Sequence, residues 1–321
     1  MILRFTLFFI SFSLIFSSCS QNRKKKNRYD NWIDSIEKMD VSKFDNEIFD
    51  YPDSVYNSFK GENTELSSTD YQLIQKIQNT RFKSMELSLD EVSNFSFTKH
   101  LKNKSNEHFN IRFIPLDILD PFKNYILMID MNSDWHKTIQ FFSKNHKLGE
   151  YKASIKTILE AERFDNKTLI IGQVFQSGTG VYWLQQHFFK FTNNRVIPVL
   201  QTVSSSYQYG WGCMDYGVDA KIISKNPLKI TYEKQMEFRD SLSNVVQKHK
   251  RIDTVLFVWN TQKMCYQPAT HNDKKSYYNN SSFYVGAKIN YLMKSNINWF
   301  KPLLKTKVGL SVLNQLYKIN N

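Results

Sequence analysis

The sequence predicts an α+β protein in which an antiparallel β-meander, about residues 109–267, lies between a helical N-terminal region and C-terminal helices. Three observations predict this class. Short segments of alternating apolar and polar residues recur after Phe109 and are divided by polar turns. Apolar residues at helical spacing precede and follow these segments. The chain is also 41% hydrophobic, so it can bury a sizeable core in one large or two small domains.

The N-terminus has the three parts of an export signal. Arg4 supplies a positive charge, Phe5 to Phe16 is an apolar run too short to span a bilayer, and Ser17, Ser18 and Cys19 follow. These residues resemble the bacterial lipobox, whose pattern is aliphatic, small, small, cysteine, although a phenylalanine stands at the aliphatic position. The resemblance implies that residues 1–18 are a signal peptide and that Cys19 is lipidated, with a thioether-linked diacylglycerol on its thiol and palmitate among its acyl chains. A plain secretory signal is the alternative.

A lipoprotein of this kind is exported and held to the lipid bilayer through acylated Cys19, because several acyl chains make anchoring stable. Ser20, and not Asp, follows the cysteine. By resemblance to the sorting rules of Gram-negative lipoproteins, this implies the outer membrane, facing the periplasm. Residues 19–29 then form a lipidated basic tether, which suits an anionic lipid surface or a solvated spacer.

The formal net charge of +13 does not indicate a nucleic-acid-binding protein. Arg4 and the five basic residues between positions 23 and 28 carry nearly half of it. The rest is spread over the folded part, where no nucleic-acid-binding motif accompanies it. We therefore expect no nucleic-acid partner.

Residues 30–105 are predicted to form a mainly helical region. Apolar residues at positions 32, 33, 36 and 39 share one helical face. Ser67 to Asp70 is an N-cap cluster before a second helix, and residues 88–102 indicate a third. The intervening residues 44–63 are polar and contain Pro52 and Gly61, which indicates irregular structure.

Residues 106–270 are predicted to form the β-rich domain. Asp165-Asn166 and Asn193-Asn194 are short turns of the kind that hairpins favour. Lys234 to Lys250 reads as a polar helix or an excursion inside the sheet, and residues 271–321 as a helical segment packing on the sheet. The predicted strands are 109–116, 125–131, 138–143, 156–164, 168–175, 182–192, 195–203, 218–224, 229–233 and 254–260.

The segment from Tyr207 to Gly217 is the most unusual in the chain, since it combines glycines with large aromatic residues. The aromatic residues Tyr207, Tyr209, Trp211 and Tyr216 form a candidate binding loop, because such side chains stack on sugar rings or partner side chains. The same composition also suits a loop that packs on the sheet.

Cys213 and Cys265 are the only cysteines after Cys19. Such a pair in an oxidising compartment is a candidate disulfide, and two separate buried thiols are the alternative.

Other candidate sites are weaker. Asp130, Asn132 and Asp134 place oxygen-bearing side chains at alternate positions, as at the start of a calcium loop, but a polar hairpin turn explains them equally well. We therefore expect no cofactor, with calcium as the alternative. His187 shares a predicted strand face with Phe189 and is expected to be a hydrogen-bonded histidine at the sheet surface.

No nucleophile, acid pair or metal set shows the spacing of a known catalytic motif in this sequence. The sequence therefore favours a non-enzymatic envelope lipoprotein that acts as a binding or structural module. Its partner would be an envelope protein or a glycan. The alternative is a hydrolase acting on an envelope component or a polymer, with its site in the β-rich domain.

Overall fold

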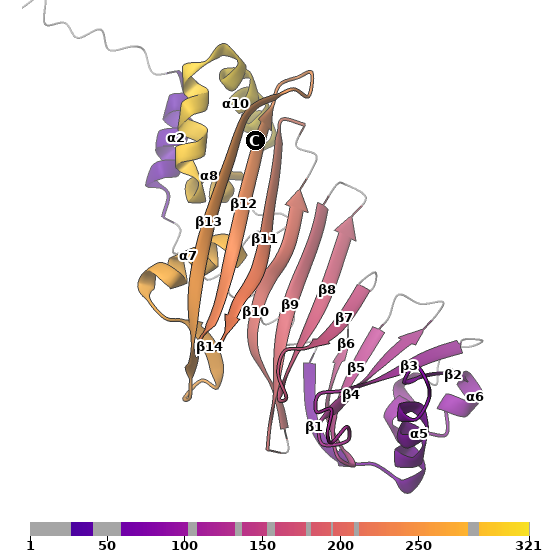
Figure 1. Ribbon diagram of the computed structural model, residues 1–321. Coiled ribbons are helices and arrows are strands. Elements are labelled where there is room, and N and C mark those ends of the chain that lie inside the picture. Colours follow the sequence, from indigo (N-terminus) through magenta and orange to yellow (C-terminus); the bar gives the residue numbers. More distant parts are fainter. Residues whose placement is uncertain are drawn as a thin grey trace, which may run out of the picture. The chain divides into compact units, whose positions relative to one another are not determined.

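The computed structural model describes residues 27–40, 59–101, 108–131, 137–152, 158–177, 181–193, 195–208, 212–281 and 289–320. The predicted signal, Cys19 and most of the tether lie outside these residues. The described chain divides into two compact units. One combines the N-terminal helix with the helices after residue 289, and the other, within residues 40–288, contains both sheets (Figure 1).

The helical unit is built from the two ends of the described chain. Its elements are α2 (Arg28–Lys38), α8 (Ile289–Ser295), α9 (Ile297–Phe300), the 3-10 helix η2 (Lys301–Lys305) and α10 (Lys307–Asn320). Asn27 caps α2 in a reciprocal capping box with Asp30. The buried Trp32 packs edge-on against Tyr317 of α10, with ring centroids 5.1 Å apart, and its indole N–H donates to Asn290 of α8.

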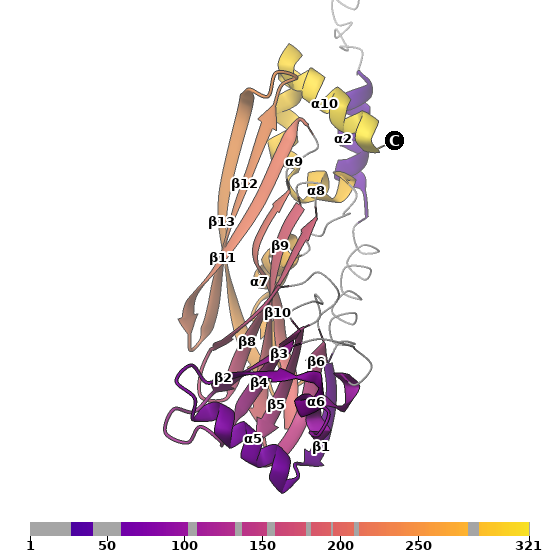
Figure 2. The same ribbon diagram turned by 90° about the vertical axis from the view of Figure 1, so that its right-hand side faces the viewer.

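The first sheet is antiparallel and six-stranded, in the order β1-β6-β5-β4-β3-β2. Its strands are β1 (Phe59–Glu65), β2 (Ser84–Ser88), β3 (His108–Pro115), β4 (Tyr125–Met131), β5 (Lys137–Ser143) and β6 (His146–Lys152). The helices α5 (Ser68–Gln78), α6 (Leu89–Val92) and η1 (Ser96–Leu101) cover one face of it (Figure 2). Ile74 and Ile77 of α5 are fully buried there in one cluster with Phe109 and Phe142.

The predicted N-cap cluster is confirmed at α5. Ser67 is the N-cap, and its hydroxyl accepts the N–H of Asp70 at 3.1 Å. The buried Asp70 carboxylate in turn accepts from the backbone N–H of Ser67 and from both the N–H and the hydroxyl of Ser96. One carboxylate therefore holds the start of α5 against η1.

The second sheet is an antiparallel meander of eight strands in chain order. Its strands are β7 (Ile158–Arg163), β8 (Thr168–Ser177), β9 (Val181–Thr192), β10 (Arg195–Gln208), β11 (Met214–Lys225), β12 (Leu228–Arg239), β13 (Val245–Asn260) and β14 (Cys265–Pro268). The predicted turns at residues 165–166 and 193–194 fall between paired strands, so both hairpins are confirmed. The antiparallel α+β class is confirmed as well.

The prediction for residues 234–250 is wrong, because β12 and β13 continue through this segment as a long hairpin. On β12 the even-numbered side chains are buried and the odd-numbered ones are partly exposed, which is the two-residue period of a strand. Met236 and Phe238 follow that period, but the charged residues around them, such as Lys234, Glu237 and Arg239, are typical of a polar helix. Lys234 is buried on the same face, and this burial lowers its pKa to about 7.

The inner faces of the two sheets share one core. Phe141 and Tyr151 of the first sheet pack on Phe189 of the second, with ring centroids 5.0 Å and 5.6 Å away. The helix α7 (His271–Ser281) covers the other end of the eight-stranded sheet, where Tyr277 packs on Phe257 of β13.

His187 lies in this interior and not at the sheet surface as expected. It is buried beside the Tyr151 ring, and among the described residues neither of its ring nitrogens has a hydrogen-bond partner. Burial lowers its pKa to about 3.

The compact units differ from the domains expected from the sequence. The region 30–105 contains the strands β1 and β2 beside its helices, and α2 belongs with the C-terminal helices. Of the predicted segment 271–321, the described helix α7 packs on the sheet, whereas residues 289–320 belong to the helical unit.

Candidate functional site

The candidate site lies on the outer face of the eight-stranded sheet, where β9, β10 and β11 pair. Tyr207, near the end of β10, is opposite Gly217 on β11 and opposite Tyr182 on β9. Its ring occupies the space above Gly217: a Cβ atom added to the glycine would lie 2.8 Å from the Tyr207 ring. Only glycine at position 217 therefore lets the ring lie across β11.

The Tyr207 hydroxyl is fixed at the far side of that glycine. It donates a hydrogen bond to Oδ2 of Asp219, which is two residues further along β11. Ser205 donates to the other carboxylate oxygen, Oδ1, at 2.8 Å. Because Ser205 is directly opposite Asp219 in the sheet, the three side chains hold one another in place. The tyrosine ring is thus restrained before any ligand arrives.

Tyr182 extends the aromatic surface to the neighbouring strand. Its ring centroid is 6.4 Å from that of Tyr207, and the two ring planes are tilted by 38°. Both side chains are partly exposed. Burial raises the pKa of the Tyr182 hydroxyl above its usual value, and the nearby negative charges of Glu160 and Asp219 raise it further. We call Tyr182, Tyr207 and Asp219 the tyrosine face.

The structure separates the residues of the predicted aromatic loop. Tyr207 belongs to the outer face, but Tyr216 points to the opposite side of the sheet and is buried. Tyr209 and Trp211 lie outside the described residues. Sequence reasoning missed Tyr182 and Asp219, which reach the site through strand pairing. The close spacing of glycines and tyrosines in residues 207–217 is the sequence signal that indicates Tyr207.

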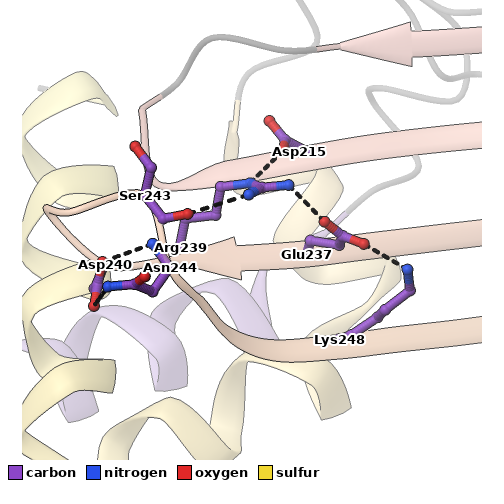
Figure 3. Close-up of polar contacts among 7 residues, drawn as sticks. All are labelled: Asp215, Glu237, Arg239, Asp240, Ser243, Asn244 and Lys248. Atoms are coloured by element: carbon purple, nitrogen blue, oxygen red, sulfur yellow. Dashed lines mark hydrogen bonds and ion pairs between the residues drawn. The ribbon is translucent and has the colours of Figure 1, made fainter.

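A charged network occupies the same sheet nearer the β12–β13 turn (Figure 3). Arg239 donates to Asp215 at 2.6 Å and to Glu237 at 2.7 Å, and its guanidinium also reaches the carbonyl of Ser243. Lys248 binds the other oxygen of Glu237, and this hydrogen bond holds the pKa of Glu237 below its usual value. Two positive and two negative charges compensate one another, so this network stabilises the hairpin and offers no net charge to a ligand.

The turn itself is closed by an aspartate. Asp240 accepts from the backbone N–H of Leu242 and of Asn244, each at 2.9 Å. Hydrogen bonds from the backbone and side chain of Asn244 lower the pKa of Asp240. The hairpin end is therefore ordered by its own side chains.

Two carboxylates lie side by side near the tyrosine face. Asp219 of β11 is paired with Glu233 of β12, and Glu233 binds Lys250 at 2.6 Å. Asp219 accepts from Tyr207 and Ser205. Both carboxylates are therefore engaged by neighbouring side chains.

The candidate calcium residues are only partly described. Asp130 forms an ion pair with Lys137 across the β4–β5 pair, with the charged atoms 2.7 Å apart, whereas Asn132 and Asp134 lie outside the described residues. Within the described ranges, no group of three or more His, Cys, Asp or Glu side chains is placed to hold a metal ion.

The candidate disulfide between Cys213 and Cys265 does not form; both thiols are free. The Cys213 carbonyl accepts the N–H of Arg239 at one end of the β12–β13 hairpin. Cys265 is paired with Asn260 at the other end of β13. At about 3.3 Å per strand residue, the length of β13 separates the two cysteines by roughly 50 Å, far beyond the reach of a bridge. Burial also raises the pKa of the Cys213 thiol to about 11.

Comparison with known proteins gives no relative: no protein-family model, no curated protein and no solved structure matches the chain. No helix in the described part of the chain has the length and apolar character needed to cross a membrane.

Proposed function

We propose that this chain is a lipid-anchored envelope protein that acts without catalysis, as a binding module whose ligand contacts the tyrosine face. One observation carries the proposal: the partly exposed Tyr207 ring is fixed across Gly217 by Asp219. A ring over a glycine also stabilises a sheet, as cross-strand aromatic residues do elsewhere. The hydroxyl anchor goes further, because it fixes an amphipathic side chain in one orientation at the surface.

Such a restraint favours binding. A side chain that is already held in one rotamer loses little further conformational entropy when a ligand contacts it. Tyrosine adds a large contact area together with a polar hydroxyl, which is why it is common in binding surfaces. The second ring, Tyr182, doubles the aromatic area at the same place.

The hydrolase alternative rests on Asp219 and Glu233, the neighbouring carboxylates. We favour binding because Glu233 is engaged by Lys250 and Asp219 by two hydroxyl groups. An acid and base pair needs two carboxylates that both face the substrate, and Glu233 is held by the Lys250 ammonium group. Replacement of Glu233 by Gln separates the two ideas: a hydrolase would lose turnover of its polymer, whereas a binding module would retain its ligand.

The proposed anchor is the acylated Cys19, on the outer membrane facing the periplasm. The support is the resemblance of residues 17–19 to the lipobox, together with the basic residues that follow. Radiolabelled palmitate should mark the wild-type protein and leave the Cys19→Ala variant unmarked. Equal labelling of both proteins, or labelling of neither, would replace the anchored protein by a plain secreted one.

The binding role is tested by recovery of partners from envelope extracts. Wild-type protein should recover a ligand that Tyr207→Ala and Gly217→Ala lose, because an alanine methyl group at position 217 displaces the ring. Gly172→Ala is the matched control. Gly172 shares the outer face through its pairing with Glu160 and Gln186, and an added Cβ meets Leu184 at an ordinary 3.4 Å. Equal recovery by all four proteins would remove the tyrosine face from the proposal.

A further inference from the structure

Resting on the proposed function, we infer that the ligand of the tyrosine face is a saccharide chain without acidic groups. A sugar ring presents apolar C–H groups on its faces and hydroxyl groups at its rim. A complementary surface needs aromatic rings for the first and hydrogen-bonding side chains beside them for the second. The tyrosine face supplies both within a few residues of three adjacent strands.

The aromatic part consists of two rings and not one. Tyr182 and Tyr207 are partly exposed, with centroids 6.4 Å apart and planes tilted by 38°. Two neighbouring, partly exposed rings can contact successive units of an extended chain. The fixed hydroxyl of Tyr207 keeps one of these rings from turning away.

The polar part surrounds these rings. A carboxylate has about four acceptor positions, and Asp219 uses one for Tyr207 and one for Ser205. Acceptor positions therefore remain for hydroxyl groups of a ligand. Gln235 is directly opposite Gly217 on β12 and adds an amide group, which both donates and accepts.

Two negatively charged side chains near the rings disfavour an acidic saccharide. Glu160 and Asp219 are both close enough to raise the pKa of Tyr182, and among the described residues neither is paired with a cation. The nearest lysine along the row of Tyr207, Lys250, is bound to Glu233. Uronic acid, sulfate or phosphate groups would therefore be repelled, whereas neutral or amino sugars are accepted.

A protein partner is the competing ligand class. Protein interfaces bury an apolar centre, whereas the exposed large apolar side chains of this sheet lie away from the tyrosines: Ile252 and Val258 are on β13, and Ile223 is four residues beyond Asp219 on β11. Apart from Tyr182 and from Leu184, which is opposite Ser205, the neighbours of Tyr207 on this face are Ser205, Asp219 and Gln235. The composition of the tyrosine face thus favours a saccharide.

The test uses the full chain, purified from membranes in detergent, and measures binding by titration calorimetry. The probes are cello-oligosaccharides, chitosan oligosaccharides and oligogalacturonates. We expect binding of a neutral or amino oligosaccharide and none of the acidic one. Tyr207→Ala and Gly217→Ala should weaken that binding by about tenfold or more, while Gly172→Ala leaves it unchanged. Circular dichroism and thermal unfolding establish that each variant is folded.

Asp219→Asn adds a test of the charge argument. Asparagine can still accept from the Tyr207 hydroxyl but removes the negative charge, so the exclusion of oligogalacturonates should weaken. Failure of every oligosaccharide to bind the wild-type protein would overturn the inference, as would equal binding by Tyr207→Ala. If the envelope extract still yields a protein that Tyr207→Ala and Gly217→Ala lose and Gly172→Ala retains, the binding module stands and the saccharide is wrong.

Discussion

His187 is an uncharged residue in the folded protein over most of the pH range. Its ring is fully buried between the sheets beside Tyr151, and burial holds its pKa at about 3. In the unfolded chain the same ring has a pKa near the usual value of about 6.5. Between these values the unfolded state binds a proton that the folded state does not, so stability falls as pH falls from about 6.5 to about 3.

This residue therefore gives a pH prediction. Each pH unit in that interval should remove about 1.4 kcal/mol of unfolding free energy on account of His187. In urea titrations from pH 7 to pH 4, His187→Gln should show a shallower loss of stability than the wild type. Only the slopes are compared, so a lower absolute stability of the variant does not matter. Parallel slopes would mean that the ring takes up its proton in the folded state.

Asp70 is a second buried residue whose contribution to the stability of the fold can be measured. It is buried and accepts hydrogen bonds from Ser67 and Ser96, which join α5 to η1. Asp70→Ala should lower the unfolding free energy by about 2–4 kcal/mol, because the cap is lost and buried N–H groups lose their acceptor. Chemical denaturation measures the change.

Glu91 provides the control for that measurement. It forms the same capping box with Ser88 at the start of α6, but at an exposed position. Glu91→Ala should cost clearly less than Asp70→Ala. Equal costs would show that local capping alone, and not the contact with Ser96, explains the role of Asp70.

At the scale of elements, α10 contains a glycine that helix propensity alone would count as a defect. Gly309 lies in the first turn of α10, and a Cβ atom there would be 2.2 Å from the carbonyl oxygen of Leu303 in η2. An alanine in an exposed helix is normally stabilising relative to glycine by about 1 kcal/mol. Here the backbone of η2 occupies the space, so the sign reverses.

Gly309→Ala should therefore destabilise the helical unit by about 1–3 kcal/mol, as overpacking does. Ser311→Ala is the matched control, since position 311 is exposed on the same helix and alanine is the better helix former. Hydrogen exchange of α10 amides measures both. Faster exchange is expected for the first variant and equal or slower exchange for the second; a stabilised Gly309→Ala would contradict the close approach.

The same scale shows what a single sequence can and cannot predict. A strand with a continuous apolar run, such as β4, is predicted with the bounds that the structure has. The β12–β13 hairpin was not, because its exposed positions are charged and its buried face includes Lys234. Of the tyrosine face, only Tyr207 could be predicted from the sequence, because it lies close to several glycines. Its pairing with Tyr182 depends on the register of β10, which shifts between Val203 and Ser205 and cannot be read from spacing.

At the scale of the whole molecule, the free thiols become a test of the topology. Cys213 and Cys265 are held at opposite ends of the long hairpin. Protein isolated from an oxidising compartment should therefore carry two alkylatable thiols after denaturation without reductant, as intact mass would show. Under native conditions the partly exposed Cys265 should react before the buried Cys213. A mass two hydrogens lower, with no alkylation, would require a different arrangement of the sheet.

The helical unit joins two parts of the chain that are far apart in the sequence. Trp32, Ile33 and Ile36 of α2 are buried, and Trp32 contacts Tyr317 and Asn290. Because the chain is synthesised from its N-terminus, α2 exists long before these partners do. The apolar face of α2 therefore stays exposed until the C-terminal helices have been synthesised. Folding of the helical unit therefore depends on the end of the chain: α2 is made before every described strand, yet its apolar face is covered only when α8 and α10 are present.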